Sequence, residues 1–359
     1  MQVIRIALIC NITKSERTAK RQNLIKSYLC FLLLFKITAT NQFSMKLFWF
    51  LRARSCQYKS TMDNTSMLKS VKACIPTLDG NKHKGQAGRI GIVGGSLEYT
   101  GAPYFAGISA MKVGADLVHI FCASSAASVI KSYSPELIVH PLLDRPNATI
   151  EISPWLERLH ALVIGPGLGR ENETFKVVTE LISTIREKKI PLVIDADGLF
   201  LITNKPELIK DFLSPVILTP NKIEFERLCN SLGGATELSK LGRCVTVFKK
   251  GEIDEVYSPV PEFQWKSNLY GSNRRCGGQG DVLSGSIATF LNWTLKNKDK
   301  IEFGSANDKP WAAASLSCYA ASVLVRLSNE KAFKIKGRSM LAGDMIECIH
   351  ESFEELYGQ

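Results

Sequence analysis

Histidine is scarce in this chain, and its cysteines are not spaced as metal ligands. Of 359 residues, 5 are His and 10 are Cys, and no two cysteines form a Cys-x-x-Cys pair. Structural zinc sites and disulfide frameworks both depend on such clusters. The sequence therefore argues against both kinds of site and favours a reducing compartment.

Acidic residues are nearly missing from the first 62 positions. That segment holds eleven Lys or Arg against a single acid, Glu16, and so accounts for almost all of the formal net charge of +11. The remaining chain is close to neutral and lacks the basic field that binds a polynucleotide. We therefore expect no nucleic acid as a partner.

A long apolar run is also missing, since the patch at 28–35 is far shorter than the roughly 20 residues that span a membrane. We expect no membrane span. The basic, acid-poor composition, with Ser and Thr, predicts that residues 1–62 are a disordered transit extension for mitochondrial import. A secretory signal peptide is the alternative, because the patch resembles an apolar h-region. A later start at Met45 or Met62 would give a cytosolic form.

Short Val/Ile/Leu runs alternate with helical stretches over residues 65–357, which we expect to form one α/β domain. Continuous apolar strands between helices predict a mostly parallel central sheet with helices on both faces. Ligands of such sheets bind beyond the carboxyl ends of the strands. The expected strands are 89–93, 117–122, 136–140, 162–164, 192–194, 216–218, 244–249 and the hairpin return 255–258. The expected helices are 65–72, 101–113, 124–131, 154–159, 172–188, 221–230, 281–295, 310–327 and 339–355.

The segment 271–281, Gly-Ser-Asn-Arg-Arg-Cys-Gly-Gly-Gln-Gly-Asp, stands directly before an apolar helix. Glycines at a helix start let backbone N–H groups and the positive end of the helix dipole approach phosphate oxygens. Arg274 and Arg275 add forked donors that match phosphate. A helix cap and a glycine turn would explain a lone Gly-Asp pair. The glycine density and the two arginines favour a phosphate site with the carboxylate of Asp281 at its mouth.

Other polar residues follow strands and allow two interpretations each. Asn221 and Glu224 have the spacing of a capping box, and the same spacing would order water around Mg²⁺. Asp195 and Asp197 either hold a metal or hydrogen-bond a turn. The charged segment 249–254 either touches a nucleotide or is a hairpin tip. The glycines of 165–169 depart from Gly-x-Gly-x-x-Gly and are a weak dinucleotide signal.

Taken together, these motifs resemble those of the ATP-dependent (S)-NAD(P)H-hydrate dehydratases, which belong to the ribokinase-like superfamily. The resemblance covers about residues 66–357. The motifs that carry it are the segments 84–96 and 99–106, Gly165-Pro-Gly-Leu-Gly169, Asp195-Ala-Asp-Gly-Leu199, Leu218-Thr-Pro-Asn-Lys-Ile-Glu-Phe225 and Arg274-Arg-Cys-Gly-Gly-Gln-Gly-Asp281.

The resemblance implies a lyase of metabolite repair, with a ribokinase-like fold. Such an enzyme uses ATP to phosphorylate the hydroxyl of the S form of hydrated NADH or NADPH. It then expels phosphate and regenerates the reduced cofactor. The implied ligands are NADH hydrate, NADPH hydrate, ATP as co-substrate and Mg²⁺. A separate epimerase chain is the implied functional partner, since residues 1–62 are too few for a fused one, and a homo-oligomer is compatible with the family.

The resemblance also implies site residues. Asp281 would be the base, and the N–H groups of Gly278, Gln279 and Gly280 would stabilise the transferred phosphoryl group. Asn221 and Glu224 would organise Mg²⁺ through water. The hydrated dinucleotide would contact Gly101, Asn221, Lys222, Ile223, Glu224, Phe225, Glu226, Arg227 and Asp281. ATP would contact Lys250, Gly251, Glu252, Ile253, Asp254, Gly271, Ser272, Asn273, Arg274, Arg275, Cys276, Gly277, Gly278, Gln279 and Gly280.

Three other functions compete with this interpretation. A ribokinase-like small-molecule kinase would keep its phosphorylated product, and the Gly-Gly-Gln-Gly-Asp segment argues against it. A non-catalytic dinucleotide-binding protein would bind without turnover and would not need Asp281. An oxidoreductase is disfavoured because no complete dinucleotide fingerprint is present.

Overall fold

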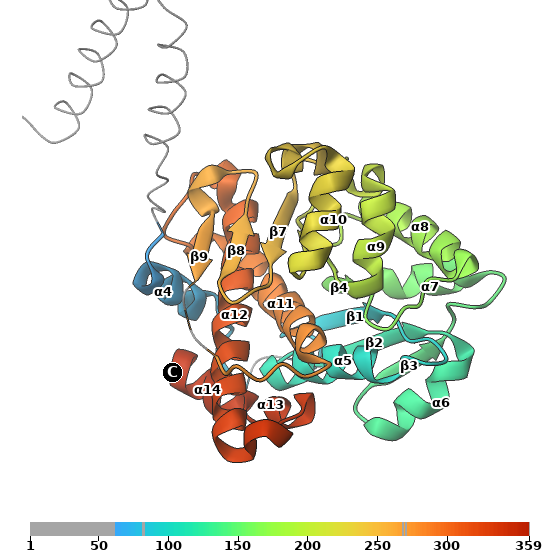
Figure 1. Ribbon diagram of the computed structural model, residues 1–359, viewed down its shortest axis with the longest axis horizontal. Helices are drawn as coiled ribbons and strands as arrows, with labels where there is room; N and C mark the ends of the chain where they lie inside the picture. The colour runs from blue at the N-terminus through green and yellow to red at the C-terminus, as the bar shows by residue number, and fades with distance from the viewer. Residues whose placement is uncertain (1–61, 81–82, 268, 270, 359) are drawn as a thin grey trace, which may run out of the picture. The chain divides into compact units, whose positions relative to one another are not determined.

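The structure is a computed structural model that describes residues 62–80, 83–267, 269 and 271–358 (Figure 1). The predictions of a targeting extension, of its apolar patch at 28–35 and of a start at Met45 fall on residues outside this part of the chain. Within the described ranges, no helix is long and apolar enough to cross a bilayer.

A single sheet runs through the described residues in the order β3-β2-β1-β4-β5-β6-β7-β8-β9. The first seven strands in sequence pair in parallel, and β8 and β9 add antiparallel pairs at one edge. This confirms the mostly parallel sheet and the expected hairpin. The strands are β1 (Arg89–Val93), β2 (Leu117–Cys122), β3 (Ile138–Pro141), β4 (Ala161–Ile164), β5 (Leu192–Ile194), β6 (Val216–Leu218), β7 (Val245–Lys249), β8 (Asp254–Tyr257) and β9 (Trp265–Ser267).

Helices pack on both faces of this sheet (Figure 1). Successive strand side chains point to opposite faces, so Val163 lies in one core while its neighbours Leu162 and Ile164 lie in the other. One core is completed by α4 (Asn64–Cys74), α5 (Gly101–Val113), α6 (Ser124–Tyr133), α11 (Gln279–Lys296), α12 (Lys309–Lys336), α13 (Ala342–Glu347) and α14 (Ile349–Tyr357). The other is completed by α7 (Ala148–Leu156), α8 (Asn172–Glu187), α9 (Ala196–Asn204) and α10 (Lys222–Leu232).

Close packing of α11 against α5 fixes where α11 begins. A Cβ atom on Gly285 would lie only 2.0 Å from the carbonyl oxygen of Ala106, so no side chain fits between the two helices there. One turn further along, the Thr289 hydroxyl donates to the carbonyl of Ala110 at 3.1 Å. The first turn of α11 is thereby held at the carboxyl edge of the sheet.

Several predicted elements are wrong in extent. The helix expected at 154–159 begins at Ala148, because Ile152 and Leu156 are buried one turn apart and Pro154 is accommodated inside the helix. α12 continues to Lys336 instead of ending at 327, and its Lys331 pairs with Glu355 at 2.8 Å. The single helix expected at 339–355 is divided into α13 and α14.

Two elements were not predicted from the sequence. α9 follows β5 directly, where Asp-Ala-Asp-Gly was read as a turn, and β9 extends the sheet beyond the hairpin. The remaining predicted elements agree with the structure to within about two residues at each end. Short 3₁₀ helices occupy Pro206–Ile209, Ala235–Leu241, Pro261–Phe263, Lys298–Lys300, Ala306–Asp308 and Gly337–Ser339.

Candidate active site

Two cavities open at the carboxyl edge of the sheet and meet at the first turn of α11. Gly280 lines one cavity of about 610 Å³, and the next residue, Asp281, lines the other, of about 770 Å³. The first cavity follows β6 and β7, whereas the second follows β1 to β5. The linings of the two cavities are therefore adjacent at Gly280 and Asp281.

The first cavity combines most of the predicted ATP segment with side chains from the closing helices. It is lined by Asn221, Lys222, Lys250, Gly251, Glu252, Asp254, Gly271, Arg275, Cys276, Gln279, Gly280, Leu283, Ser322, Val325, Arg326, Asn329 and Met345.

The loop before α11 is fixed by its own hydrogen bonds. The Ser272 N–H donates to Asn329 Oδ1 at 2.6 Å, and Arg275 Nη1 donates to the Ser272 carbonyl at 2.7 Å. Gln279 Nε2 donates to the Arg274 carbonyl at 3.2 Å. The loop enters the helix through Gly278, whose φ of 92° is a left-handed conformation that suits glycine. The N–H groups at the start of α11 are thus presented to the cavities in a set geometry.

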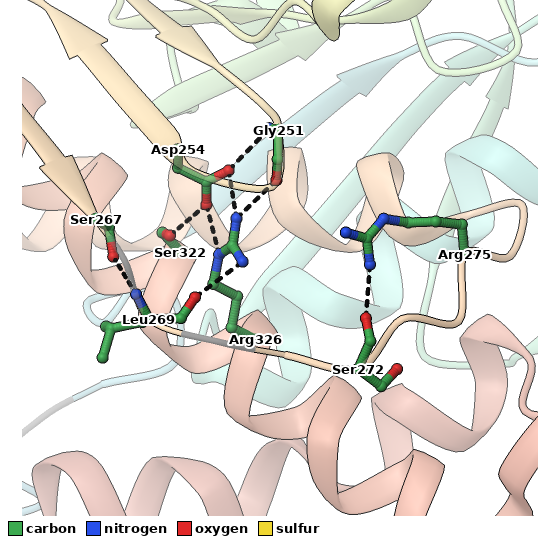
Figure 2. A network of polar contacts seen from close by, with 8 residues as sticks. All are labelled: Gly251, Asp254, Ser267, Leu269, Ser272, Arg275, Ser322 and Arg326. Carbon is green, nitrogen blue, oxygen red and sulfur yellow. Dashed lines mark hydrogen bonds and ion pairs between the residues drawn. The ribbon is translucent and has the colours of Figure 1, made fainter.

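A buried ionic network forms the wall of the first cavity (Figure 2). Asp254 accepts from Arg326 Nε at 2.8 Å and from the Ser322 hydroxyl at 2.7 Å, and Arg326 Nη2 lies 2.7 Å from the other carboxylate oxygen. Arg326 also donates to the carbonyls of Gly251 and Leu269, both at 2.9 Å. The network ties the hairpin tip to α12, so Asp254 is occupied in holding the wall rather than free for a ligand.

Lys250 turns inward from the end of β7 and meets Asp195 at the end of β5. The Lys250 Nζ atom lies 2.7 Å from Asp195 Oδ1, with 20% and 3% of the two side chains exposed. Burial disfavours the charged form of Lys250 and so lowers its pKa. The negative charges nearby, of Asp195, Glu224 and Asp281, have the larger effect, and the pKa of Lys250 is held above its usual value. Lys250 does lie at the tip of the hairpin between β7 and β8, and its ammonium group also faces the site.

The two aspartates of the Asp-Ala-Asp segment point to different partners. Asp195 caps α9, accepting the Ala196 N–H at 2.9 Å, while Asp197 accepts from Arg170 Nε at 2.8 Å and from the Gly169 N–H at 3.1 Å. Ala196 between them has φ of 47°, a strained value for a residue with a side chain. The two carboxylates therefore belong to different hydrogen-bond networks, and the described residues contain no group of three or more His, Cys, Asp or Glu that could hold a metal ion.

Asp281 lies in the first turn of α11 and faces the second cavity. Burial, reinforced by the negative charge of Asp195, raises the pKa of Asp281 to about 8, although Lys250 opposes the shift. Perturbed carboxyl groups in a cavity are characteristic of acid–base sites. The arrangement gives Asp281 the basicity to accept a proton near neutral pH.

Asn221 and Glu224 form the capping box at the start of α10. Asn221 Oδ1 accepts the Glu224 N–H at 3.0 Å, and Glu224 Oε2 accepts the Asn221 N–H at 2.8 Å. The second carboxylate oxygen, Oε1, takes no part in the box. Burial raises the pKa of Glu224, so a neighbouring cation would favour its charged form.

The predicted dinucleotide residues are only partly brought together. Asn221 and Lys222 line the first cavity and Asp281 lines the second, whereas the rest of that set lines neither. Phe225 is a buried residue of α10, and its ring centroid lies 5.2 Å from that of Tyr257. Of the predicted ATP set, the residues outside the wall are Ile253, Ser272, Asn273, Arg274, Gly277 and Gly278.

Sequence reasoning missed the residues that α12 brings to the first cavity and the loops that build the second. α12 was read as a core helix, yet Arg326 interrupts its apolar stretch, and a buried arginine requires an acidic partner. The second cavity is lined by Gly95, Ser96, Leu97, Glu98, Tyr99, Ala102, Ala123, Ser125, Leu143, Asp144, Gly167, Leu168, Gly169, Arg170, Glu171, Thr174, Ala196, Asp197 and Asp281.

Comparisons with known proteins agree with this geometry. A family model described as NAD(P)H-hydrate dehydratase matches residues 90–351. The ATP-dependent (S)-NAD(P)H-hydrate dehydratase of Aedes aegypti is 54% identical over 300 residues, covering 82% of this chain and 86% of that protein. The human protein of the same name is 47% identical over 307 residues, covering 82% and 85%.

Solved structures share the fold at low sequence identity. A ribokinase-like superfamily protein from Enterococcus faecalis superposes with a TM-score of 0.63 at 19% identity, covering 81% of this chain and 95% of that one. The ADP/ATP-dependent NAD(P)H-hydrate dehydratase of Bacillus subtilis, co-crystallised with ATP and Mg²⁺, gives a TM-score of 0.57 at 20% identity, covering 80% and 96%. The ribokinase-like fold is confirmed.

Proposed function

Since the chain belongs to the NAD(P)H-hydrate dehydratase family, we propose that it regenerates NADH and NADPH from the S forms of their hydrates, with ATP converted to ADP and phosphate. It is a lyase of the ATP-dependent kind. The observation that carries the assignment of its centre is the meeting of two cavities at Gly280 and Asp281.

ATP occupies the cavity beside the Gly271 to Gly280 loop, and the hydrated nicotinamide ring occupies the cavity beside Asp281. Asp281 takes the proton of the ring hydroxyl as that oxygen attacks the γ-phosphorus of ATP, so ADP leaves. The bond between the ring carbon and the phosphorylated oxygen then breaks, and phosphate leaves with the bonding electrons. The neighbouring ring carbon loses a proton to solvent, and the carbon–carbon double bond that forms restores the reduced nicotinamide. Both cavities are needed, because the hydroxyl and the γ-phosphate come from different ligands.

Fixed donors at the start of α11 stabilise the phosphoryl group during transfer. Gln279 and Gly280 line the first cavity, and Gly278, which lines neither cavity, directly precedes them as the N-cap of α11, where the helix dipole favours negative charge. A Cβ atom on Gly280 would lie 3.3 Å from Lys250 Nζ, so the ammonium group stands directly beside this turn. Lys250 supplies a compensating positive charge for the phosphates.

The residues near the first cavity fit a magnesium ion that arrives with ATP. Mg²⁺ keeps several waters and is held by few carboxylates together with substrate phosphates. Glu224 Oε1 is outside the capping box, and the described residues offer no all-protein cage. Asn221 and Glu224 therefore organise the ion through water, and the ion would neutralise phosphate charge.

The roles of the chain's two parts and its partners are proposed from its composition and its family. Residues 65–357 are the catalytic domain, and residues 1–62 are a targeting extension that directs it to mitochondria, with a cytosolic form from a downstream start. An epimerase on a separate chain supplies the S hydrate from the R form, and the chain is compatible with a homo-oligomer. A fluorescent reporter fused to residues 1–62 tests the location: a reporter signal with no mitochondrial fraction would contradict mitochondrial targeting.

The reaction is tested by mixing the full chain with NADH hydrate, ATP and Mg²⁺ and following reduced nicotinamide absorbance together with free phosphate. The proposal predicts that NADH and phosphate appear in equal amounts and only when ATP is present. A small-molecule kinase would consume ATP and accumulate a stable phosphoester instead. A binding protein would retain the dinucleotide without consuming ATP.

A further inference from the structure

The cavity beside Asp281 is acidic, although its proposed ligand is an anion. Its lining includes Glu98, Asp144, Glu171, Asp197 and Asp281. Among the described residues that line it, Arg170 is the one basic side chain. A dinucleotide carries a negatively charged diphosphate between its two nucleosides, and an acidic cavity repels it unless a cation compensates.

Arg170 is held in one orientation by two side chains of α9. Its Nε donates to Asp197 Oδ1 at 2.8 Å, and its guanidinium carbon lies 4.4 Å from the ring centroid of Phe200. The contacts of Arg170 within the described part of the chain leave both terminal nitrogens unused. These two nitrogens form the fork that binds phosphate oxygens through two parallel hydrogen bonds.

The position of Arg170 also suits a ligand that enters from solvent. Its side chain is 55% exposed, and the loop that carries it, after β4, lines the same cavity as Asp281. Asp197, the residue that anchors Arg170, also accepts the Gly169 N–H at 3.1 Å and so ties the loop to α9. The guanidinium is therefore a fixed, solvent-reachable anion site on the wall of the cavity that holds the reacting ring.

We propose that Arg170 binds the diphosphate that joins the two nucleosides of the substrate, and that Asp197 is its positioning residue. The inference rests on the proposed function, because it takes the cavity beside Asp281 as the site of the hydrated dinucleotide. The diphosphate is common to NADH and NADPH, so Arg170 acts on both substrates equally.

The test compares Arg170→Ala and Arg170→Lys with the wild-type full chain. The dissociation constant of NADH is measured by its fluorescence, and KM and kcat are measured for the NADH and NADPH hydrates and for ATP. Arg158→Ala is the matched control, because Arg158 is also an exposed arginine stacked on an aromatic ring, Trp155, at 5.5 Å, and lines neither cavity.

Arg170→Ala is expected to weaken NADH binding about tenfold to a hundredfold, as the loss of a charge-assisted contact does. KM for both hydrates rises by a similar factor, while kcat and KM for ATP stay unchanged. Arg170→Lys recovers part of the affinity, because it keeps the charge and loses the fork. Arg158→Ala changes none of these values.

A fragment without phosphate separates binding from structural damage. Reduced nicotinamide riboside lacks the diphosphate, so its dissociation constant is expected to be the same in wild-type and Arg170→Ala proteins. Equal weakening of the riboside and NADH would overturn the inference, as would unchanged NADH binding. An effect confined to NADPH would also overturn it, because Arg170 would then bind the extra phosphate of that cofactor.

Asp197→Asn tests the positioning role. Loss of the anchoring charge is expected to raise KM for both hydrates by less than Arg170→Ala does, with kcat unchanged. When Asp197→Asn is combined with Arg170→Ala, KM is expected to rise little beyond its value in Arg170→Ala alone. Additive effects would contradict it. Failure of the proposed function is distinguishable from all these outcomes, because it would appear in the wild-type protein as ATP-dependent turnover that yields no NADH.

Discussion

The Lys250 ammonium nitrogen lies 2.7 Å from Asp195 Oδ1, joining the end of β7 to the end of β5 beneath the first turn of α11. Both side chains are largely withdrawn from water. A buried ion pair of this kind adds little net stability to the fold. Removing one partner is nevertheless strongly destabilising, because the other charge is left buried and uncompensated. The pair also sets the field around Asp281, because Asp195 raises and Lys250 lowers the pKa of that carboxyl group.

Lys250→Met is therefore expected to lower the free energy of unfolding by about 3 kcal/mol, measured by denaturant titration. It should also raise KM for ATP, because the cation beside Gly280 is lost. Lys249→Met is the control: it breaks the neighbouring pair with Glu255, at 2.8 Å, which lies outside the cavity wall. Equal loss of ATP affinity in both variants would contradict a specific role for Lys250.

Ionisation of Asp281 is expected to make the protein less stable as pH rises. Its pKa is 3.8 in an unfolded chain and about 8 in the structure, so the folded protein binds the extra proton between these values. The stabilising contribution is fully present below pH 3.8 and is lost as pH rises through about 8. Asp281→Asn should remove this slope and should be more stable than wild type above pH 8, as read from melting temperatures.

The same pKa predicts how the reaction depends on pH. A base must be ionised to accept a proton, so kcat/KM for the hydrate should rise with pH and level off above about 8. The measurement is the pH profile at a fixed, saturating ATP and Mg²⁺ concentration. If kcat/KM does not change as the pH is raised to about 8 and beyond, a group other than Asp281 takes the proton.

Three substitutions separate capping from magnesium binding at the start of α10. Asn221→Ser keeps a side chain that caps a helix, so stability should be retained, whereas Asn221→Ala should lose about 1 kcal/mol. Glu224→Gln keeps the capping box but removes the charge, and the Mg²⁺ concentration that gives half-maximal rate should rise. If Glu224→Gln needs no more Mg²⁺ than wild type, the pair acts only as a cap.

Alanine at two neighbouring glycines should give different defects. At Gly278 a Cβ atom would lie 2.7 Å from the Phe105 ring and 2.8 Å from Ala342, and φ is 92°, so Gly278→Ala should lower the melting temperature clearly. At Gly280 the nearest atoms are Lys250 Nζ at 3.3 Å and Asp195 Oδ2 at 3.7 Å. Gly280→Ala should fold normally but raise KM for ATP. A normal KM would place the phosphates elsewhere.

Hydrophobic pattern predicted most of the fold because it reports burial directly. Parallel strands such as β1 and β4 are buried on both faces and read as unbroken apolar runs. α9 was missed because its first turn is Asp-Ala-Asp-Gly, a sequence typical of turns, and its helical state depends on capping by Asp195 and on packing of Leu199 and Ile202. The end of α12 was missed because its last turns are polar and are held by contacts with α14.

The candidate site was predictable only where its chemistry is local in sequence. The loop from Gly271 to Asp281 carries its own signal, because glycine, arginine and aspartate stand together. Arg326 interrupts an apolar helix and so indicates only that it needs an acidic partner, and Arg170 carries no such signal. Their partners are Asp254 for Arg326 and Asp197 and Phe200 for Arg170, all distant in the chain. Such pairs are created by the fold, and residue types alone do not identify them.

The most direct test of the account is the rate at which Asp281→Asn regenerates NADH from its hydrate with ATP and Mg²⁺, measured beside its affinities for NADH and ATP. The account predicts that both affinities stay close to wild type while kcat falls about a hundredfold or more, because the base is missing and the fold is kept. Near wild-type regeneration by Asp281→Asn would contradict the assignment of Asp281 as the base at the junction of the two cavities.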